Sequence, residues 1–267
     1  MFFILQKEDK YNDLDIDILT LKQELNKQRY QHEYTTMNLK DFDDGVKFPD
    51  RMNIKNAIPV GSLEFVGAYL KLVHNIKRMN PIEIPNEMRL DKFINRKYSI
   101  VEKNELPKSG YFFTKYASEL KVFSHTGRIE TLQHEDDGKE PFIKDGLYVV
   151  SEVVNILSEY RCFILDDEIK GIQYYDGNPT IMPTPEDINK LKEMVLRYSI
   201  NPNRPMAYTL DVAIIKDRGL SIIECHPFCS VGLYGLVGSF LPYAYRYGLD
   251  WYINHNLELE KYNNFNS

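Results

Sequence analysis

The sequence is poor in cysteine and lacks any long apolar run. Its 267 residues include only Cys162, Cys225 and Cys229, an odd and small number that gives no disulfide framework. No apolar stretch approaches the roughly 18 residues that a membrane-spanning helix needs. The first ten residues become charged too early to form a signal peptide. These absences predict a soluble, cytoplasmic protein without a membrane partner.

Positive charge is also in short supply, and two common catalytic motifs are missing. Lysine and arginine total 33 against 39 acidic residues, which gives a formal net charge of -6. Because a basic face supplies most of the affinity for nucleic acid, we expect no nucleic-acid partner, although a local basic pocket for phosphates stays compatible with this composition. The chain has no Gly-x-Ser-x-Gly, which disfavours a nucleophilic hydrolase, and its GLYGLVGS segment lacks the lysine of a phosphate-binding loop.

The N-terminal third alternates between strand-like and helix-like segments. Short β-rich runs at 2–5 and 32–39 predict strands. Apolar residues recur at helical spacing over 14–25 and again over 63–73, where Ser62 is a plausible N-cap. This order predicts a small α/β domain with a parallel sheet.

The rest of the chain is dominated by strands. Asp166-Asp167 and the turn at 217–219 have the composition of hairpin turns, so we expect a largely antiparallel sheet. One helix interrupts it, with Thr184 as its cap, Pro185 at its first position and Asp187 completing a capping box. The β-rich segments are 111–116, 120–124, 147–154, 159–166, 168–175, 207–216 and 219–225.

These patterns predict an α/β (α+β) fold in three parts. Residues 1–95 form the small α/β domain, and residues 96–256 form the larger β-rich region. The segment 257–267 is polar, and we expect it to fray as a tail.

Two acidic residues lie on neighbouring apolar strands. Asp211 lies within YTLDVAII, and Glu224 ends the returning strand LSIIEC, so antiparallel pairing places them side by side. Paired carboxylates are good ligands for Mg²⁺, and His226 points to the same face as Glu224 if the strand continues. The alternative is two carboxylates at solvent-exposed strand ends.

Three basic residues also lie in β-rich segments. Arg161 lies in an otherwise apolar or aromatic run, where a guanidinium can clamp a phosphate or carboxylate; the alternative is a structural ion pair with Glu159 or Glu152. Lys115 shares one face with aromatic neighbours in GYFFTKY, and a lysine there can neutralise phosphates. Lys121 fits the same role, or it snorkels from an exposed face.

A zinc site is a weaker interpretation of the same region. Cys225 and Cys229 flank His226, but the spacing Cys-x-x-x-Cys without a second pair is poor evidence for zinc. Both cysteines fit better as small buried residues beside Glu224.

The order of these residues resembles the ATP-grasp superfamily, and within it a phage-associated clade marked by one arginine and two lysines. The resemblance covers about residues 110–234 and is carried by FFTKY, SEVVNILSEYRCFI, TLDVAI and IIECHPFCSVGLY. The last segment resembles the family's acid-x-Asn-Pro metal motif, with His226 in place of the asparagine. The resemblance implies an ATP-grasp fold with ATP and Mg²⁺ as cofactors.

The resemblance also implies a role for each matching residue. Lys115 and Lys121 would contact the phosphates of ATP, with Lys121 and Arg161 as the catalytic residues. Arg161 would hold the γ-phosphate or an acyl phosphate, while Asp211 and Glu224 would bind Mg²⁺. The hinge beside the adenine and further nucleotide contacts would comprise Ser151, Glu152, Val153, Val154, Glu159 and His226.

The activity implied is ATP-dependent ligation of a carboxylate to an amine through an acyl phosphate. The partners would be small-molecule or peptide carboxylates and amines, and a protein substrate is left open. Two alternatives stay open: a phosphotransferase on the same fold, and a non-catalytic nucleotide-binding module. The four charges at Lys115, Arg161, Asp211 and Glu224 argue against the second, because a dead site has no reason to keep them.

Overall fold

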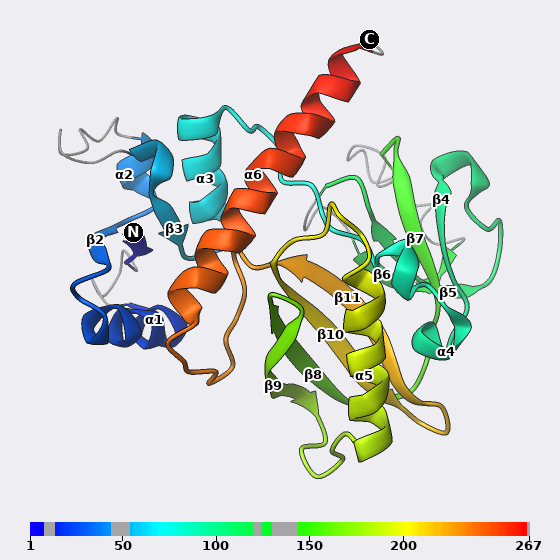
Figure 1. The fold of residues 1–267 in the computed structure, drawn as a ribbon. Helices are drawn as coiled ribbons and strands as arrows, with labels where there is room; N and C mark the ends of the chain where they lie inside the picture. The colour runs from blue at the N-terminus through cyan, green and yellow to red at the C-terminus, as the bar shows by residue number, and fades with distance from the viewer. Residues whose placement is uncertain (8–13, 44–53, 120–123, 130–143, 266–267) are drawn as a thin grey trace.

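The computed structural model describes residues 1–7, 14–43, 54–119, 124–129 and 144–265. Within these ranges the strands form three sheets (Figure 1). One sheet lies at the N-terminal end of the molecule, and the other two are built from the β-rich remainder of the chain. The predicted mixture of helices with largely antiparallel strands is confirmed.

The N-terminal sheet is parallel, with strand order β2-β1-β3. Its strands are β1 (Phe2–Gln6), β2 (Glu33–Met37) and the unpredicted β3 (Ile58–Val60). Helices α1 (Ile16–Lys27) and α3 (Leu63–His74) accompany it. The predicted strand–helix alternation is confirmed. The short helical turns in this part are α2 (Lys40–Asp43) and η1 (Ile54–Asn56).

The C-terminal helix α6 (Leu241–Phe265) completes the core of this N-terminal sheet. Its residues Ala244, Tyr245 and Tyr252 are buried in one apolar cluster with Phe3 and Leu5. Figure 1 shows α6 crossing between the N-terminal sheet and the strands β10 and β11, and it contacts both. Residues 257–265, which we expected to form a polar tail, continue this helix.

The second sheet is antiparallel, with strand order β11-β10-β8-β9. Its strands form two hairpins, and the turn residues Asp166, Asp167 and Asp217 have positive φ angles of 52, 60 and 61°. Asp adopts this left-handed conformation more readily than most residues, so both predicted hairpin turns are confirmed. The bounds are β8 (Ile156–Leu165), β9 (Glu168–Gly177), β10 (Ala207–Ile215) and β11 (Gly219–Pro227).

Helix α5 (Pro185–Tyr198) covers one face of this second sheet. Its buried residues Leu191, Met194 and Val195 pack against apolar side chains of β8, β10 and β11. Ile84, Met88 and Phe93 join the same core, although they precede the expected domain boundary at residue 95. The opposite face of the sheet is thereby left to the polar residues of β8, β10 and β11.

The third sheet is antiparallel, with strand order β4-β7-β5-β6. A short connection at 153–155 links its strand β7 to β8 of the second sheet. The bounds are β4 (Tyr98–Glu102), β5 (Tyr111–Tyr116), β6 (Ser124–Arg128) and β7 (Leu147–Glu152), and the short helical turns are α4 (Asp91–Ile94), η2 (Asn86–Met88) and η3 (Lys103–Glu105). Strand β4 was not predicted.

The start of α5 gives a direct test of the predicted capping box. Thr184 Oγ1 accepts from Asp187 N at 3.2 Å, and Asp187 Oδ2 accepts from Thr184 N at 2.9 Å. Thr184→Ala removes this acceptor, so we expect the free energy of unfolding to fall by about 1 kcal/mol. Urea denaturation measures the change. Thr184→Ser keeps the acceptor and should stay close to the wild type; an equal loss in both variants would contradict the role of the cap.

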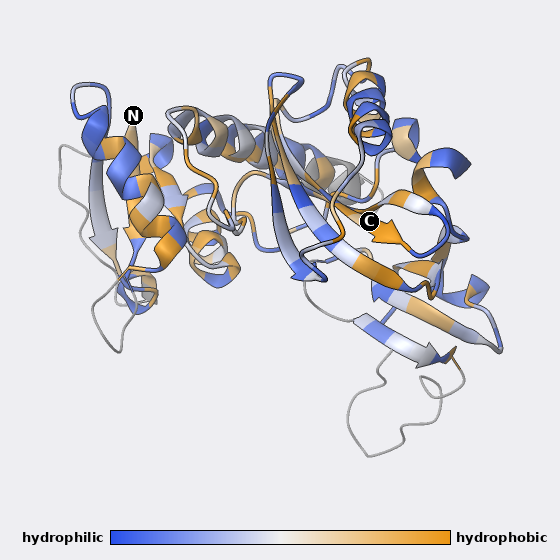
Figure 2. Ribbon diagram, turned by 90° about the horizontal axis from the view of Figure 1, so that it is seen from below, coloured by the Kyte–Doolittle hydropathy of each residue, from blue (hydrophilic) through white to orange (hydrophobic). Residues whose placement is uncertain are grey.

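None of the described helices is long and apolar enough to cross a membrane. Coloured by hydropathy, the helices mix hydrophilic and hydrophobic residues along their lengths (Figure 2).

Candidate functional site

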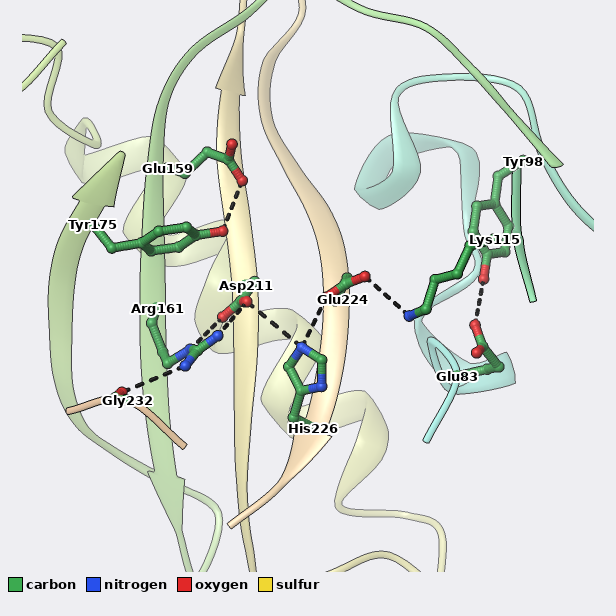
Figure 3. A network of polar contacts seen from close by, with 10 residues as sticks. All are labelled: Glu83, Tyr98, Lys115, Glu159, Arg161, Tyr175, Asp211, Glu224, His226 and Gly232. Atoms are coloured by element: carbon green, nitrogen blue, oxygen red, sulfur yellow. Dashed lines mark hydrogen bonds and ion pairs between the residues drawn. The ribbon is translucent and has the colours of Figure 1, made fainter. Parts of the chain in front are cut away.

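Three neighbouring strands bring the predicted charged residues onto one face of the second sheet. Asp211 on β10 pairs with Arg161 on β8 and with Glu224 on β11. Residues directly opposite in an antiparallel ladder point to the same side. Their side chains therefore gather on the face opposite α5, as Figure 3 shows. The predicted pairing of Asp211 with Glu224 is confirmed.

A β-bulge in β11 explains why Glu224 faces this cluster. The register shifts by one residue beside Asp211, which leaves Ile223 as the extra residue of β11. Strict alternation would place Glu224 on the face of buried Ile222, against α5. Because of the bulge, Cys225 joins the apolar core with Ile222, while Glu224 and His226 face the charged cluster. The local irregularity thus sets which side chains are available for chemistry.

Arg161 and Asp211 form a bidentate ion pair at the centre of the cluster. Arg161 Nε and Nη2 donate to the two carboxylate oxygens of Asp211, each at 2.7 Å. Burial alone would raise the pKa of Asp211, but the contacts with Arg161 and His226 outweigh it and lower that pKa. The alternative partners are engaged elsewhere: Glu159 accepts from Tyr175, and Glu152 pairs with Arg218. The ion pair predicted for Arg161 with Glu159 or Glu152 is therefore not formed.

His226 bridges the two acidic residues. Its Nε2 lies 2.9 Å from Glu224 Oε2 and 3.6 Å from Asp211 Oδ2. Burial opposes protonation of the imidazole, but the two carboxylates outweigh burial and raise its pKa. The Asp211 side chain is only 5% exposed. The alternative that this acid lies at a solvent-exposed strand end is therefore wrong.

Lys115 reaches the cluster from the third sheet. Its Nζ donates to Glu224 Oε1 at 3.0 Å, and its side chain is 17% exposed. Burial disfavours the ammonium, but the neighbouring carboxylates of Glu224 and Glu83 raise its pKa. The contact joins strand β5 to β11 across the space between the two sheets (Figure 3). Lys121 lies outside the described residues, so its role stays a prediction.

The connection between the sheets has main-chain groups to spare. Ser151 is buried, and Glu152 N donates to Lys97 O at 2.9 Å. In the described part of the chain, no main-chain hydrogen bond involves Val153 or Val154. An unpaired donor and acceptor at the edge of a cavity can bind the edge of a planar heterocycle.

A buried arginine fixes this connection in place. Arg96 donates to Ser151 Oγ at 2.9 Å, to Ser221 Oγ at 2.8 Å and to Ile222 O at 2.7 Å. These bonds tie β7 of the third sheet to β11 of the second sheet.

Two adjoining cavities open around the cluster. The first has a volume of about 430 Å³ and is bordered by apolar side chains together with residues 151–154 and Glu159. The second, of about 730 Å³, is lined by Arg161, His226 and the segment 229–232. Both include Lys115 and Glu224, so they meet at the charged cluster. Volumes of this size are typical of sites for nucleotide-sized molecules.

A family model described as an ATP-grasp domain, the second family of its clade, matches residues 92–239. The chain belongs to this family. No curated protein matches the chain in sequence. The ATP-grasp fold predicted from the sequence is confirmed, and the match spans all five residues of the charged cluster.

Solved structures with the same fold cover nearly the whole chain at low identity. D-alanyl-alanine synthetase A from Vibrio cholerae has a TM-score of 0.55 and 11% identity, covering 95% of this chain and 99% of its own. D-cycloserine synthetase DcsG has a TM-score of 0.51 and 7% identity, covering 94% and 100%. A RimK domain protein from Sphaerobacter thermophilus has a TM-score of 0.51 and 11% identity, covering 96% and 99%. At these identities the likeness concerns the fold alone.

The ATP-grasp family implies a magnesium ion, and the donor set fits one in part. One ligand atom from each of Asp211, Glu224 and His226 lies within 4.8 Å of the others. Carboxylate oxygens are ligands that Mg²⁺ prefers, whereas imidazole suits it less. Asp211 and Glu224 therefore fit the ion, and His226 departs from an all-oxygen site.

Sequence reasoning missed several residues of this ATP-grasp cleft. Tyr175 and Tyr234 stack at 5.2 Å between ring centroids, with the Arg161 guanidinium over both rings. Glu83 lines the first cavity and accepts from Tyr98 Oη at 3.3 Å. The only local signal for Glu83 is a glutamate between two isoleucines in NPIEIPNEM. Nothing in the sequence shows that this segment lies against β4.

The burial of Glu83 predicts a pH-dependent stability. Burial raises the pKa of this carboxyl above its ordinary value of 4.5. A folded-state pKa above the unfolded value contributes stability that is present below pH 4.5 and is lost as the pH rises through the folded-state pKa. Relative to Glu83→Gln, the wild type should therefore lose stability between pH 4.5 and neutrality. Urea midpoints of both proteins across this range test the prediction, and parallel profiles would contradict it.

Proposed function

We propose that the protein is an ATP-dependent ligase that joins a carboxylate to an amine through an acyl phosphate. The observation that carries the proposal is the convergence of Lys115 from one sheet with Arg161, Asp211, Glu224 and His226 from the other. This cluster borders both cavities, so a molecule in the first cavity and a second one beyond it would meet at these charges.

The first cavity suits the base and ribose of ATP. Its apolar walls match a purine ring, and the free main-chain groups of Val153 and Val154 face the same space. We assign Ser151, Glu152 and Glu159 to the nucleotide contacts as well, since they line this cavity. The triphosphate would extend from there toward Lys115, with Lys121 as the second lysine.

Asp211 and Glu224 would hold Mg²⁺ beside the phosphates. The ion supplies charge neutralisation and alignment of the phosphate oxygens when it is bound. Without a nucleotide the two carboxylates are paired with Arg161, His226 and Lys115 instead. We infer an exchange of partners, in which these cations turn to the phosphates when the carboxylates take the metal.

Arg161 then acts as the main stabiliser of the reacting phosphate. Its guanidinium lies over the rings of Tyr175 and Tyr234 and borders the second cavity, where a substrate carboxylate would approach. The carboxylate oxygen attacks the γ-phosphorus and ADP leaves; an amine then attacks the acyl carbon and phosphate leaves. Arg161 and the lysines offset the growing negative charge, and the cleft holds the reactants in line.

The solved relatives support this reaction class through their described substrates. They include D-alanyl-alanine and D-cycloserine synthetases, and an ATP-grasp ligase, PsnB, complexed with a minimal precursor at a TM-score of 0.50 and 11% identity, covering 94% of this chain and 99% of its own. We propose a small-molecule or peptide carboxylate and amine as the partners here. We further propose that Arg161, Lys115 and Lys121 are the arginine and lysines that mark the clade, and that the chain divides functionally near residue 95.

Trapping the activated carboxylate tests the reaction type. The protein is incubated with ATP, Mg²⁺ and pools of amino acids and short peptides, with hydroxylamine as the nucleophile. A ligase should release ADP and form a hydroxamate, and Arg161→Lys should form at least about tenfold less, because lysine cannot make the bidentate contact. A stable phosphorylated product that accumulates without any amine would instead show a phosphotransferase.

A further inference from the structure

Glu83 carries a buried oxygen without a partner. Its Oε2 accepts from Tyr98 Oη at 3.3 Å, whereas Oε1 is buried and has no hydrogen-bond partner among the described residues. A buried carboxylate oxygen is costly to leave unpaired, because it has lost its bonds to water. Figure 3 shows the Glu83–Tyr98 pair beside Lys115, at the edge of the cleft. The unpaired oxygen is therefore available to a hydrogen-bond donor from outside the chain.

The surroundings of Glu83 indicate which part of a nucleotide would bring that donor. Glu83 lines the first cavity but not the second, which contains Arg161 and His226. A carboxylate repels phosphates, so it belongs at the end of the nucleotide that lacks them. The other residues at this end are mostly aliphatic, and they include Ile82, Ile84, Val149, Val153, Val154, Ile156 and Ile223. A polar group among them, with its orientation set by Tyr98, is placed to read a base.

We propose that Glu83 selects a nucleobase that carries an exocyclic amino group, with its free carboxylate oxygen accepting a hydrogen from that amine. The inference rests on the proposed function, because it requires the nucleotide to occupy the first cavity. It goes further by assigning the choice of adenine over 6-oxopurines to a side chain, in addition to the main chain of residues 153–154.

The chemistry of purines supports this selection. The 6-amino group of adenine has two hydrogens, so one can bind a main-chain carbonyl and the other a carboxylate. Hypoxanthine and guanine carry a carbonyl oxygen at the same position. That oxygen would place an acceptor against the acceptor of Glu83 and leave both unpaired in an apolar cavity. Discrimination therefore comes from repulsion of the wrong base as well as attraction of the right one.

Side-chain variants at this position separate base selection from nucleotide binding in general. Dissociation constants for ATP, ITP and purine riboside triphosphate are measured by calorimetry with Mg²⁺ for the wild type, Glu83→Gln, Glu83→Leu and the control Glu186→Gln. Glu186 lies in the exposed first turn of α5. Urea denaturation of each variant confirms that it is folded before titration.

We expect the wild type and Glu186→Gln to bind ATP at least about tenfold more tightly than ITP or purine riboside triphosphate. In Glu83→Gln the ATP preference over ITP should narrow, because the amide can donate to the 6-oxo group. In Glu83→Leu the affinity for ATP should fall about tenfold, toward that for purine riboside triphosphate.

Two other results would overturn the inference, and they differ in meaning. Equal affinity of the wild type for all three nucleotides, or an unchanged preference in both Glu83 variants, would overturn the role of Glu83 and leave the proposed function standing. Failure of the folded wild type to bind any of the three would overturn both.

Discussion

Arg161→Met is expected to lower the free energy of unfolding by about 3–5 kcal/mol. The substitution keeps much of the side-chain length but removes the guanidinium that donates two bonds of 2.7 Å to Asp211. Asp211 is then left buried with only His226 as a cationic neighbour, at 3.6 Å. A buried carboxylate without a full partner is among the most destabilising changes in a protein core. Urea denaturation without nucleotide or metal measures the effect.

Two further variants show whether the loss comes from the buried charge. Arg197→Met removes an ion pair to Glu193 in which both side chains are more than a third exposed, so it should cost less than about 1 kcal/mol. Adding Asp211→Asn to Arg161→Met removes the stranded charge and should restore part of the stability. An equally small effect of both arginine substitutions would contradict the account of the cluster.

Lys115→Met is expected to weaken the binding of ATP with Mg²⁺ at least about 30-fold. In the nucleotide-free protein the ammonium pairs with Glu224, and in the proposed complex it turns to the phosphates. Methionine fills similar space but offers the phosphates no charge. Calorimetric titration of ATP measures the dissociation constant, after denaturation has confirmed that the variant is folded.

Lys103→Met is the matched control for this substitution. Lys103 also forms an ion pair at 2.8 Å, but its partner Asp145 is exposed and neither residue lines the two cavities. Its removal should leave the affinity for ATP unchanged. If Lys115→Met bound ATP as tightly as Lys103→Met, the phosphates would not lie beside Lys115.

The sequence predicted elements with strong local signals and missed those formed by distant contacts. The hairpin turn at Asp166-Asp167 and the capping box at Thr184 and Asp187 follow from backbone preferences of a few adjacent residues. Strands β3 and β4 are short and lack a clear alternation, because pairing with distant strands decides their conformation. Helix α6 continues past residue 256 although the sequence there is polar.

The candidate site shows the same division. Pairing of Asp211 with Glu224 could be predicted, because both lie on the arms of one hairpin. The sequence does not show the bulge at Ile223, which directs Glu224 and His226 into the cleft. Nor does it show the ion pair of Arg161 with Asp211, since any neighbouring acid could serve as partner until the strand order is known. Glu83 reaches the cavity from an irregular segment that carries no periodic signal.

The most direct test of the account is calorimetric titration of ATP into the wild type and into Asp211→Asn plus Glu224→Gln, with and without Mg²⁺. Both substitutions preserve side-chain shape and remove the charges that would hold the ion. The account predicts binding to the wild type that Mg²⁺ strengthens, and loss of that magnesium dependence in the double variant. Absence of binding to the folded wild type at millimolar ATP would contradict it.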